Sequence, residues 1–285
     1  MSIPFRIDLT GKVAVVTGGG GVLCSAMARA LAECGARVAV LNRTEATAEA
    51  AAASIRETGG QAMAVPADVL DPDSLTAARD RLENAWGPAD ILINGAGGNN
   101  ARGNTSREYL RSEDLGSAVE GLTTFFDLDP EGFGFVFNLN LIGTLQATQV
   151  FSRGMAERGR GCVVNISSMA ALAPLTKVPA YSGAKSAVNN FTQWLAAHFS
   201  KVGIRVNAIA PGFYITEQNR TLMTREDGSW TDRAEAILKH IPQDRFGDPE
   251  DLLGTLLWLV DDGASGYVTG TIIPVDGGFS AFSGI

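Results

Sequence analysis

The sequence predicts an α/β protein built on one doubly wound parallel sheet with helices on both faces. Short apolar runs alternate with helix-forming segments, glycines follow the first run, and an Asn-Gly turn follows the fourth. Strands that alternate with helices form βαβ units, and right-handed crossovers place the helices on both faces of the sheet. We find no repeat or long linker in the 285 residues, so we expect a single domain over residues 1–285.

The amino-terminal half shows this alternation clearly. Residues 12–17 form an apolar run that ends in glycines, which is typical of a strand buried on both faces. Glycines also end the helix-forming residues 25–34 and the Ala- and Glu-rich residues 44–58. We therefore expect strands at 12–17, 37–41, 62–66 and 90–94, with helices at 25–34, 44–58 and 73–86.

The alternation continues in the carboxyl-terminal half, after a long interruption. We expect helices over 130–158, 181–201 and 249–260, and strands at 161–168, 205–210 and 271–275. Residues 99–129 have no clear apolar period and are rich in glycine and polar residues. A connection of this length is usually functional or disordered, so we interpret 99–129 as an insertion that helps to build a substrate pocket.

Composition excludes several classes of function. The net charge of −8 argues against a nucleic-acid partner, and no apolar run approaches the about 20 residues that a membrane span needs. Residues 1–8 lack the pattern of a signal peptide. The three cysteines fit neither a zinc site nor a disulfide framework. We expect a cytoplasmic protein without a metal ion.

Tyr181 and Lys185 are the most informative pair in the chain. They are four residues apart in a predicted helix, so they share one helix face. A free phenol has a pKa of about 10; a nearby ammonium lowers that pKa, towards the range where proton transfer is efficient. Ser168 and Asn140 complete a candidate catalytic set. The alternative is an ordinary solvated pair on a helix.

Candidate cofactor-binding residues follow the first two predicted strands. Glycines 18–21, between the first strand and the first helix, would let a pyrophosphate approach the helix amino terminus. Asn42 and Arg43 follow the second strand, where an acidic residue would favour NAD and an arginine favours NADP. We therefore expect NADP, with NAD as the alternative; a plain glycine turn and an exposed arginine are the other interpretations.

The third and fourth strands end in further candidates. Asp68 and Val69 follow the third strand, where Asp68 either contacts an adenine or only leads into a helix. Residues 94–97, Asn-Gly-Ala-Gly, follow the fourth strand. Ligands of open α/β sheets bind at these carboxyl ends of strands.

Together these residues resemble the short-chain dehydrogenase/reductase family, whose members are single-domain, Rossmann-type oxidoreductases, over essentially the full chain. The interval from Ser168 to Tyr181 also suits the family and selects Ser168 over Ser167. The matching positions are Thr17 with its glycines, Asp68, 94–97, 140–143, Ser168, Tyr181, Lys185, Pro211, Gly212, Thr216 and 275–278.

The resemblance implies hydride transfer between a nicotinamide and a carbonyl or carbinol carbon. Tyr181 would exchange the proton, Ser168 would bind the substrate oxygen, and Lys185 would lower the Tyr181 pKa and bind the ribose. Asn140 would hold a water molecule, and Thr216 would meet the carboxamide. The implied cofactor-binding residues are Thr17, Gly18, Gly20, Gly21, Val22, Leu23, Asn42, Arg43, Asp68, Val69, Asn94, Ala96, Gly97, Tyr181, Lys185, Pro211, Gly212 and Thr216.

The chain departs from the family's glycine pattern at two positions, Val22 and Cys24. A valine resists the positive φ that glycine tolerates, and a cysteine adds bulk where the strand and helix pack. We therefore expect the phosphate turn to run differently, through glycines 19–21.

A narrower resemblance concerns the substrate. Residues 17–23, 174–181, 189–194, 211–213 and 216–220 resemble a subgroup of D-mannonate oxidoreductases, also called fructuronate reductases. This resemblance implies that a ketohexuronate is reduced to a hexonate.

The polar residues of the expected pocket suit a polyol with a carboxylate better than a steroid or an acyl chain; they are Asn99, Asn100, Arg102, Asn104, Arg107, Lys177, Glu217, Gln218, Asn219 and Arg220. The alternatives are a gluconate 5-dehydrogenase, a 3-oxoacyl-carrier reductase and, remotely, a non-catalytic nucleotide-binding protein. Family members usually form tetramers through two helix faces and the carboxyl-terminal strand, so we expect a homotetramer.

Overall fold

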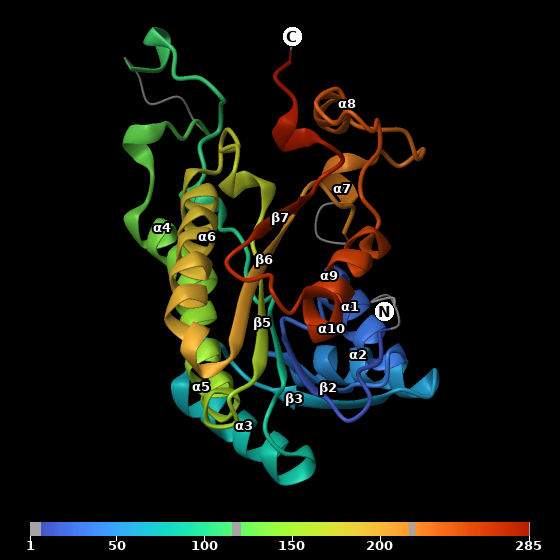
Figure 1. Ribbon diagram of the computed structural model, residues 1–285. Helices are drawn as coiled ribbons and strands as arrows, with labels where there is room; N and C mark the ends of the chain where they lie inside the picture. Colours follow the sequence, from blue (N-terminus) through green and yellow to red (C-terminus); the bar gives the residue numbers. More distant parts are fainter. Residues whose placement is uncertain (1–6, 116–120, 217–219, 285) are drawn as a thin grey trace.

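Seven parallel strands form the sheet at the centre of the protein, in the order β3-β2-β1-β4-β5-β6-β7 (Figure 1). The computed structural model describes residues 7–115, 121–216 and 220–284; Glu217, Gln218 and Asn219, which the sequence places near the substrate, lie outside them. The strands are β1 Val13–Thr17, β2 Arg37–Asn42, β3 Gln61–Pro66, β4 Ile91–Asn94, β5 Gly161–Ile166, β6 Ile204–Pro211 and β7 Ile272–Val275. The predicted fold class is confirmed.

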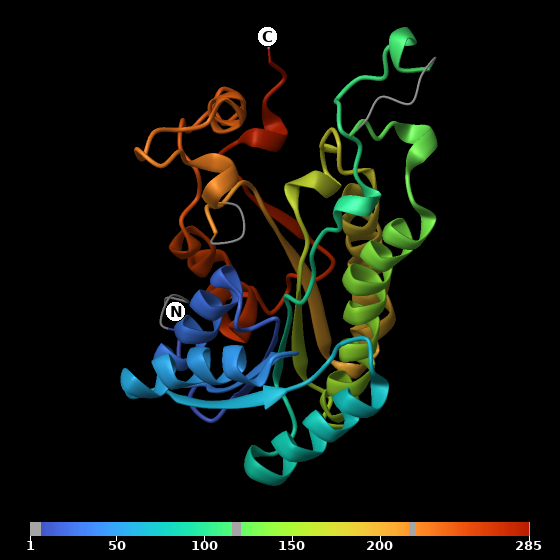
Figure 2. The same ribbon diagram turned by 180° about the vertical axis from the view of Figure 1, so that it is seen from behind.

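Helices cover both faces of the sheet, as Figures 1 and 2 show. Helices α1 (Val22–Glu33), α2 (Glu45–Glu57) and α9 (Leu253–Val260) pack with Ala14 and Val16 in one core. Helices α3 (Pro72–Trp86), α5 (Gly143–Glu157) and α6 (Pro179–Phe199) pack with Val13 and Val15 in the other. Because side chains alternate along a strand, the uninterrupted apolar run of β1 supplies both cores.

Two predicted helices differ in detail from the observed ones. The helix predicted over 130–158 consists of α4 (Pro130–Phe137), a π-helical turn (Asn138–Ile142) and α5. A π-turn adds a residue to one helical turn, which periodicity alone does not reveal. The helix predicted at 249–260 begins as a 3-10 turn (Pro249–Leu252). Among the described residues, no helix is both long and apolar enough to cross a membrane.

Two irregular regions rise above the carboxyl end of the sheet, on opposite sides of it (Figures 1 and 2). The first is the predicted insertion, whose described residues hold 3-10 turns at Ala101–Gly103, Ser112–Leu115 and Phe125–Asp127. The second contains α7 (Arg220–Met223) and α8 (Asp232–Leu238), which the sequence did not predict. It has a small core of its own, formed by Met223, Ala234, Ile241 and Phe246.

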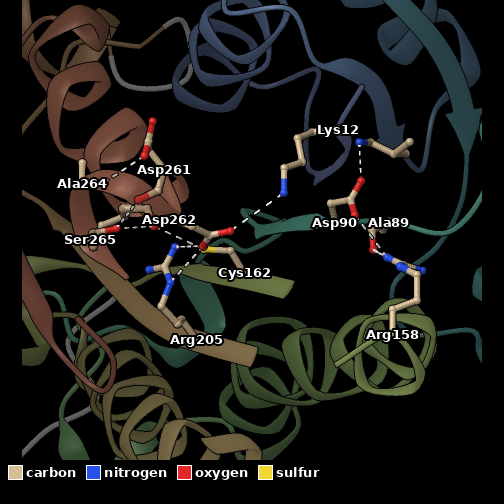
Figure 3. A network of polar contacts seen from close by, with 12 residues as sticks. Lys12, Ala89, Asp90, Arg158, Cys162, Arg205, Asp261, Asp262, Ala264 and Ser265 are labelled. Atoms are coloured by element: carbon tan, nitrogen blue, oxygen red, sulfur yellow. Dashed lines mark hydrogen bonds and ion pairs between the residues drawn. The ribbon is translucent and has the colours of Figure 1, made fainter. Parts of the chain in front are cut away.

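The amino end of the sheet is held by a network of charged side chains (Figure 3). Asp262, in the short helix α10 (Asp262–Ser265), accepts a 2.8 Å hydrogen bond from Arg205 Nη2 and lies 3.9 Å from Lys12 Nζ. Asp90 accepts a 2.9 Å bond from the Val13 amide and lies 3.4 Å from Arg158 Nη2. The network therefore ties β1, β4 and β6 to the helices behind them.

Candidate active site

A cleft of about 620 Å³ opens at the carboxyl end of the sheet. It lies above the neighbouring strands β1 and β4, where the strand order reverses; this is the topological switch point at which open α/β sheets bind ligands. Its volume is within the range of small-molecule and cofactor sites. The lining residues are Gly18, Gly20, Gly21, Val22, Leu23, Cys24, Asn42, Thr47, Gly95, Ala96, Gly97, Gly98, Ile166, Ser167, Ser168, Tyr181, Lys185, Pro211, Gly212, Phe213, Tyr214 and Thr216.

The glycine turn after β1 suits a phosphate group. Gly18 has φ +64°, and a Cβ there would lie 2.9 Å from the backbone of Ala96, so the position requires glycine. Gly21 is the N-cap of α1, and no side chain caps the helix. The first-turn amides of α1 therefore face the cleft without a side-chain acceptor, and such amides bind anions well. These residues fit the pyrophosphate of a dinucleotide.

The expected conflict at Val22 and Cys24 does not arise. Val22 is the first residue of α1 and has no positive φ, because Gly18 makes the left-handed turn instead. The bulk of Cys24 is matched by Gly95 at the end of β4. A Cβ on residue 95 would lie 2.2 Å from Cys24 Sγ. The departure from the glycine pattern at residue 24 is therefore accommodated across the turn.

Two predicted cofactor residues, Thr17 and Asn94, support the cleft from behind and do not line it. Thr17 Oγ1 accepts hydrogen bonds of 3.1 Å from the amides of Gly95 and Ala96. Asn94 Nδ2 donates to Thr148 Oγ1 at 2.9 Å and to Asn165 Oδ1 at 2.8 Å. Both side chains are buried and hold the turn after β4 in place.

The adenosine end of the cleft differs in part from the prediction. Asn42 lines the cleft, whereas Arg43 is exposed beside it. Asp68 accepts a bond from the Leu70 amide, and Val69 is buried against Gly143, so neither lines the cleft. Thr47 of α2 does line it. No sequence signal identifies Thr47; only the approach of α2 to Gly20 brings it there.

Ser168 and Tyr181 come together at the other end of the cleft. Ser168 follows β5 and Tyr181 stands in the first turn of α6; both line the cleft, where Ser168 acts to lower the pKa of Tyr181. The neighbouring Ser167 instead donates to Asn189 Oδ1. This difference favours Ser168, as the sequence interval does.

Lys185 is buried one helical turn after Tyr181. Its Nζ donates to the carbonyl oxygen of Ile166 at 2.8 Å and lies 5.7 Å from the centroid of the Tyr181 ring. Burial lowers the pKa of Lys185 to about 8, because the charged form loses its hydration.

The expected lowering of the Tyr181 pKa is wrong for the protein as described. Burial raises the pKa of Tyr181, and the hydrogen bond with Ser168 offsets only part of that rise. The physical reason is that the loss of hydration of the phenolate exceeds the local stabilisation it receives. Tyr181 is therefore protonated at neutral pH.

Asn140 is fully buried in the π-turn between α4 and α5. Its side chain bonds to both backbone groups of Gly98, at 2.7 Å to the oxygen and 3.2 Å from the amide. A Cβ on Gly97 would lie 2.6 Å from Asn140 Oδ1 and 3.2 Å from Lys185 Nζ. Gly97 therefore packs against both Asn140 and Lys185, with no room for a side chain. Asn140 holds the backbone of Gly98, next to the glycine against which Lys185 lies.

The segment after β6 closes the cleft on the remaining side. Pro211, Gly212 and Thr216 line it, together with Phe213 and Tyr214, which sequence reasoning missed. A Cβ on Gly212 would lie 2.6 Å from Asp276 Cα. The 275–278 segment that resembles the family pattern therefore supports this turn.

Comparisons with known proteins agree with this geometry. The short chain dehydrogenase family model matches residues 12–227. The uncharacterized oxidoreductase UxuB of Bacillus subtilis is 51% identical over 283 residues, which cover 99% of this chain and 100% of the relative.

Two solved structures are also similar. A provisionally named D-mannonate oxidoreductase from Haemophilus influenzae, with bound NAD, is 48% identical over 100% of both chains, with a TM-score of 0.92. A gluconate 5-dehydrogenase from Burkholderia cenocepacia, in complex with NADP and tartrate, is 29% identical over 98% of both chains, with a TM-score of 0.81. The chain belongs to the short-chain dehydrogenase family and is an NAD(P)-dependent oxidoreductase that acts on alcohol groups.

Proposed function

We propose that the protein interconverts D-fructuronate and D-mannonate with NADP(H) or NAD(H). The observation that carries the chemistry is that Ser168, Tyr181 and the buried Lys185 line the same cleft as the glycine turn. A nicotinamide bound there supplies or accepts the hydride. The side chains need only position the substrate and move one proton.

Tyr181 donates a proton to the substrate carbonyl oxygen in the direction of reduction. Its raised pKa keeps the phenol protonated at neutral pH, which suits a proton donor. Ser168 donates a hydrogen bond to the same oxygen and stabilises the negative charge that develops on it. In oxidation Tyr181 accepts the proton, which requires the phenolate, so oxidation gains from higher pH.

Lys185 and Asn140 position these groups. The Lys185 ammonium is held between Ile166 and Gly97, where it can bind the ribose hydroxyls and favour the Tyr181 phenolate when that forms. Asn140 holds Gly97 and Gly98 at the correct distance from Lys185.

The substrate assignment is supported by the relative from Haemophilus influenzae, whose provisional name specifies D-mannonate and which matches the whole chain at 48% identity. The gluconate 5-dehydrogenase alternative is supported by a relative at only 29% identity. For the cofactor, the exposed Arg43 beside Asn42 favours the extra phosphate of NADP.

The test is the loss of reduced-nicotinamide absorbance with D-fructuronate and, separately, D-tagaturonate, each with NADPH and with NADH. Rapid turnover of fructuronate supports the proposal, and the ratio of rates with the two cofactors tests Arg43. Turnover of 5-ketogluconate or of a 3-oxoacyl thioester, without turnover of either uronate, would support the assignment as an oxidoreductase but contradict the proposed substrate.

A further inference from the structure

The cationic side chains expected near the substrate differ in one respect: some form ion pairs with acidic side chains of the protein, and others do not. A hexuronate carries a carboxylate that loses hydration when it binds, so it needs a cation or amide donors in return. Among the polar residues expected around the substrate pocket, four are cationic, namely Arg102, Arg107, Lys177 and Arg220. The inference below rests on the proposed function, because only an acidic substrate needs such a partner.

Two of the four cations are neutralised by nearby acids of their own region. Arg102 Nε lies 2.6 Å from Asp129 Oδ2, and its Nη2 lies 3.1 Å from Glu131 Oε2. Arg107 Nη1 lies 2.6 Å from Asp114 Oδ1. These pairs hold the insertion together and fasten it to the start of α4. Neither arginine is therefore free for a ligand.

Lys177 and Arg220 differ from these arginines. Within the described part of the chain, neither side chain forms a hydrogen bond or an ion pair. Arg220 is exposed at the start of the four-residue helix α7, whereas Lys177 is partly buried. Lys177 is thus the better placed of the two unpaired cations.

The backbone of Lys177 is fixed between the insertion and α6. Its carbonyl oxygen accepts a 3.0 Å bond from the Thr105 amide of the insertion. Two residues earlier, the Leu175 amide donates to Ser182 Oγ of α6 at 3.2 Å. Lys177 also stands immediately before Val178, the N-cap of α6, and so four residues before Tyr181. Lys177 therefore lies at the end of α6 that carries Tyr181, whose side chain lines the cleft.

Electrostatics at this end of α6 favours an anion. The amino terminus of a helix carries a partial positive charge, and Val178 provides no side-chain cap. Lys177 adds a full positive charge next to it. Helix α6 thus carries the Tyr181 hydroxyl that binds the substrate carbonyl, and its amino end carries positive charge that can attract the substrate carboxylate.

We propose that Lys177 binds the carboxylate of the substrate and is the residue that makes the enzyme prefer a sugar acid to a neutral sugar. The ammonium forms a charge-assisted hydrogen bond with the carboxylate while Ser168 and Tyr181 bind the carbonyl oxygen. Both ends of the substrate are then fixed with respect to α6, which also fixes the carbon that receives the hydride.

The test compares D-fructuronate with its methyl ester, which has the same carbon skeleton without the charge. Lys177 has φ +70°, a conformation that glycine adopts readily, so Lys177→Gly removes the charge without straining the backbone. For this variant we expect kcat/KM for the acid to fall 10- to 100-fold, mainly through KM, and kcat/KM for the ester to change much less. Lys177→Arg should recover most of the loss.

Lys201 provides a matched control, since it is an exposed lysine just beyond the other end of α6. Lys201→Gln should leave both substrates unaffected. An equal loss for the acid and the ester in Lys177→Gly would show a structural role and overturn the inference, as would no loss for either. A selective loss of the acid in Arg220→Gln, in place of Lys177→Gly, would overturn it as well.

Binding of D-mannonate to the enzyme with NADP⁺, measured by calorimetry, separates failure of this inference from failure of the proposed function. We expect the wild type to bind and Lys177→Gly to bind at least 10-fold more weakly. If the wild type neither binds mannonate nor reduces fructuronate, the proposed function fails and the inference with it. If the wild type does both and Lys177→Gly binds equally well, the inference alone is overturned.

Discussion

At the amino end of the sheet, Arg205 and Lys12 both meet the carboxylate of Asp262, whereas at the carboxyl end Lys185 donates to the backbone carbonyl of Ile166. Asp262 is largely exposed, so water shares in the solvation of that network. Lys185 is almost fully buried and has no carboxylate beside it within the described residues. The two ends thus place cations of the same charge in very different environments.

The charges therefore stabilise the amino end of the sheet, whereas burial of the Lys185 charge destabilises the carboxyl end. Paired charges near solvent contribute modestly to stability. A buried ammonium pays a desolvation cost that appears as a lowered pKa, about 8 for Lys185. Such perturbed groups cluster at functional sites, and the structure supports assigning the chemistry to the carboxyl end.

Replacing Tyr181 by phenylalanine should have the largest effect. The substitution removes the proton donor but keeps the ring, so we expect kcat to fall by about 10³-fold or more. Binding of NADPH, followed by its fluorescence, should change by no more than a few-fold. Tyr267→Phe is the matched control, because Tyr267 is fully exposed; retained turnover in Tyr181→Phe would contradict the assigned role.

Lys185→Met should make the protein more stable at neutral pH and inactive. At pH 7 the ammonium is charged in both the folded and the unfolded state, so the full cost of its burial applies. A pKa lowered from 10.5 to about 8 corresponds to a cost on the order of 3 kcal/mol. The lost bond to Ile166 offsets part of the gain, which leaves about 2 kcal/mol.

The sign of this effect gives a pH test. Between pH 8 and 10.5 folded Lys185 loses its proton while the unfolded chain keeps it, so wild-type stability rises with pH across this window relative to Lys185→Met. Urea unfolding of both proteins at pH 7 and pH 9 measures the difference, since both values lie below the pKa of Tyr181. A stability gap that stays constant with pH would refute the strain at Lys185.

The sequence predicted the fold well, because the fold depends on short-range patterns, and similar patterns singled out the side chains that the structure brings together in the cleft. Apolar runs, glycine stops and the interval between Tyr181 and Lys185 are local features. Ser168 was separable from Ser167 by its interval from Tyr181, and the structure places it against Tyr181.

What the sequence could not predict depends on contacts between distant segments. Thr47 reaches the cleft only because α2 approaches Gly20. The rise in the Tyr181 pKa depends on how fully the tertiary structure buries the phenol. Cys24 looked like a defect in the glycine pattern, because Gly95, the residue that makes room for it, is 71 positions away in the chain.

Gly95→Ala tests that compensation directly. An added methyl group would lie 2.2 Å from Cys24 Sγ, so the turn after β4 must shift. Overpacking of this kind costs about 1–2 kcal/mol, and the Tm should fall accordingly. Combining it with Cys24→Gly should recover part of the lost Tm, as a coupled pair does in a double-mutant cycle. Strictly additive losses would show that the two residues do not compensate each other.

The smallest effect is expected at the amino end, from Asp262→Asn. The substitution removes the carboxylate that pairs with Arg205 and Lys12 but keeps a hydrogen-bond acceptor of the same size. Because Asp262 is largely exposed, we expect a loss of only about 1 kcal/mol, and a smaller one at high salt. Activity per folded molecule should not change, since Lys12 and Arg205 stand at the amino ends of β1 and β6, away from the cleft. A fall in kcat without a fall in Tm would instead show that the amino end of the sheet influences catalysis. The distinction between a stabilising end and a catalytic end would then be wrong.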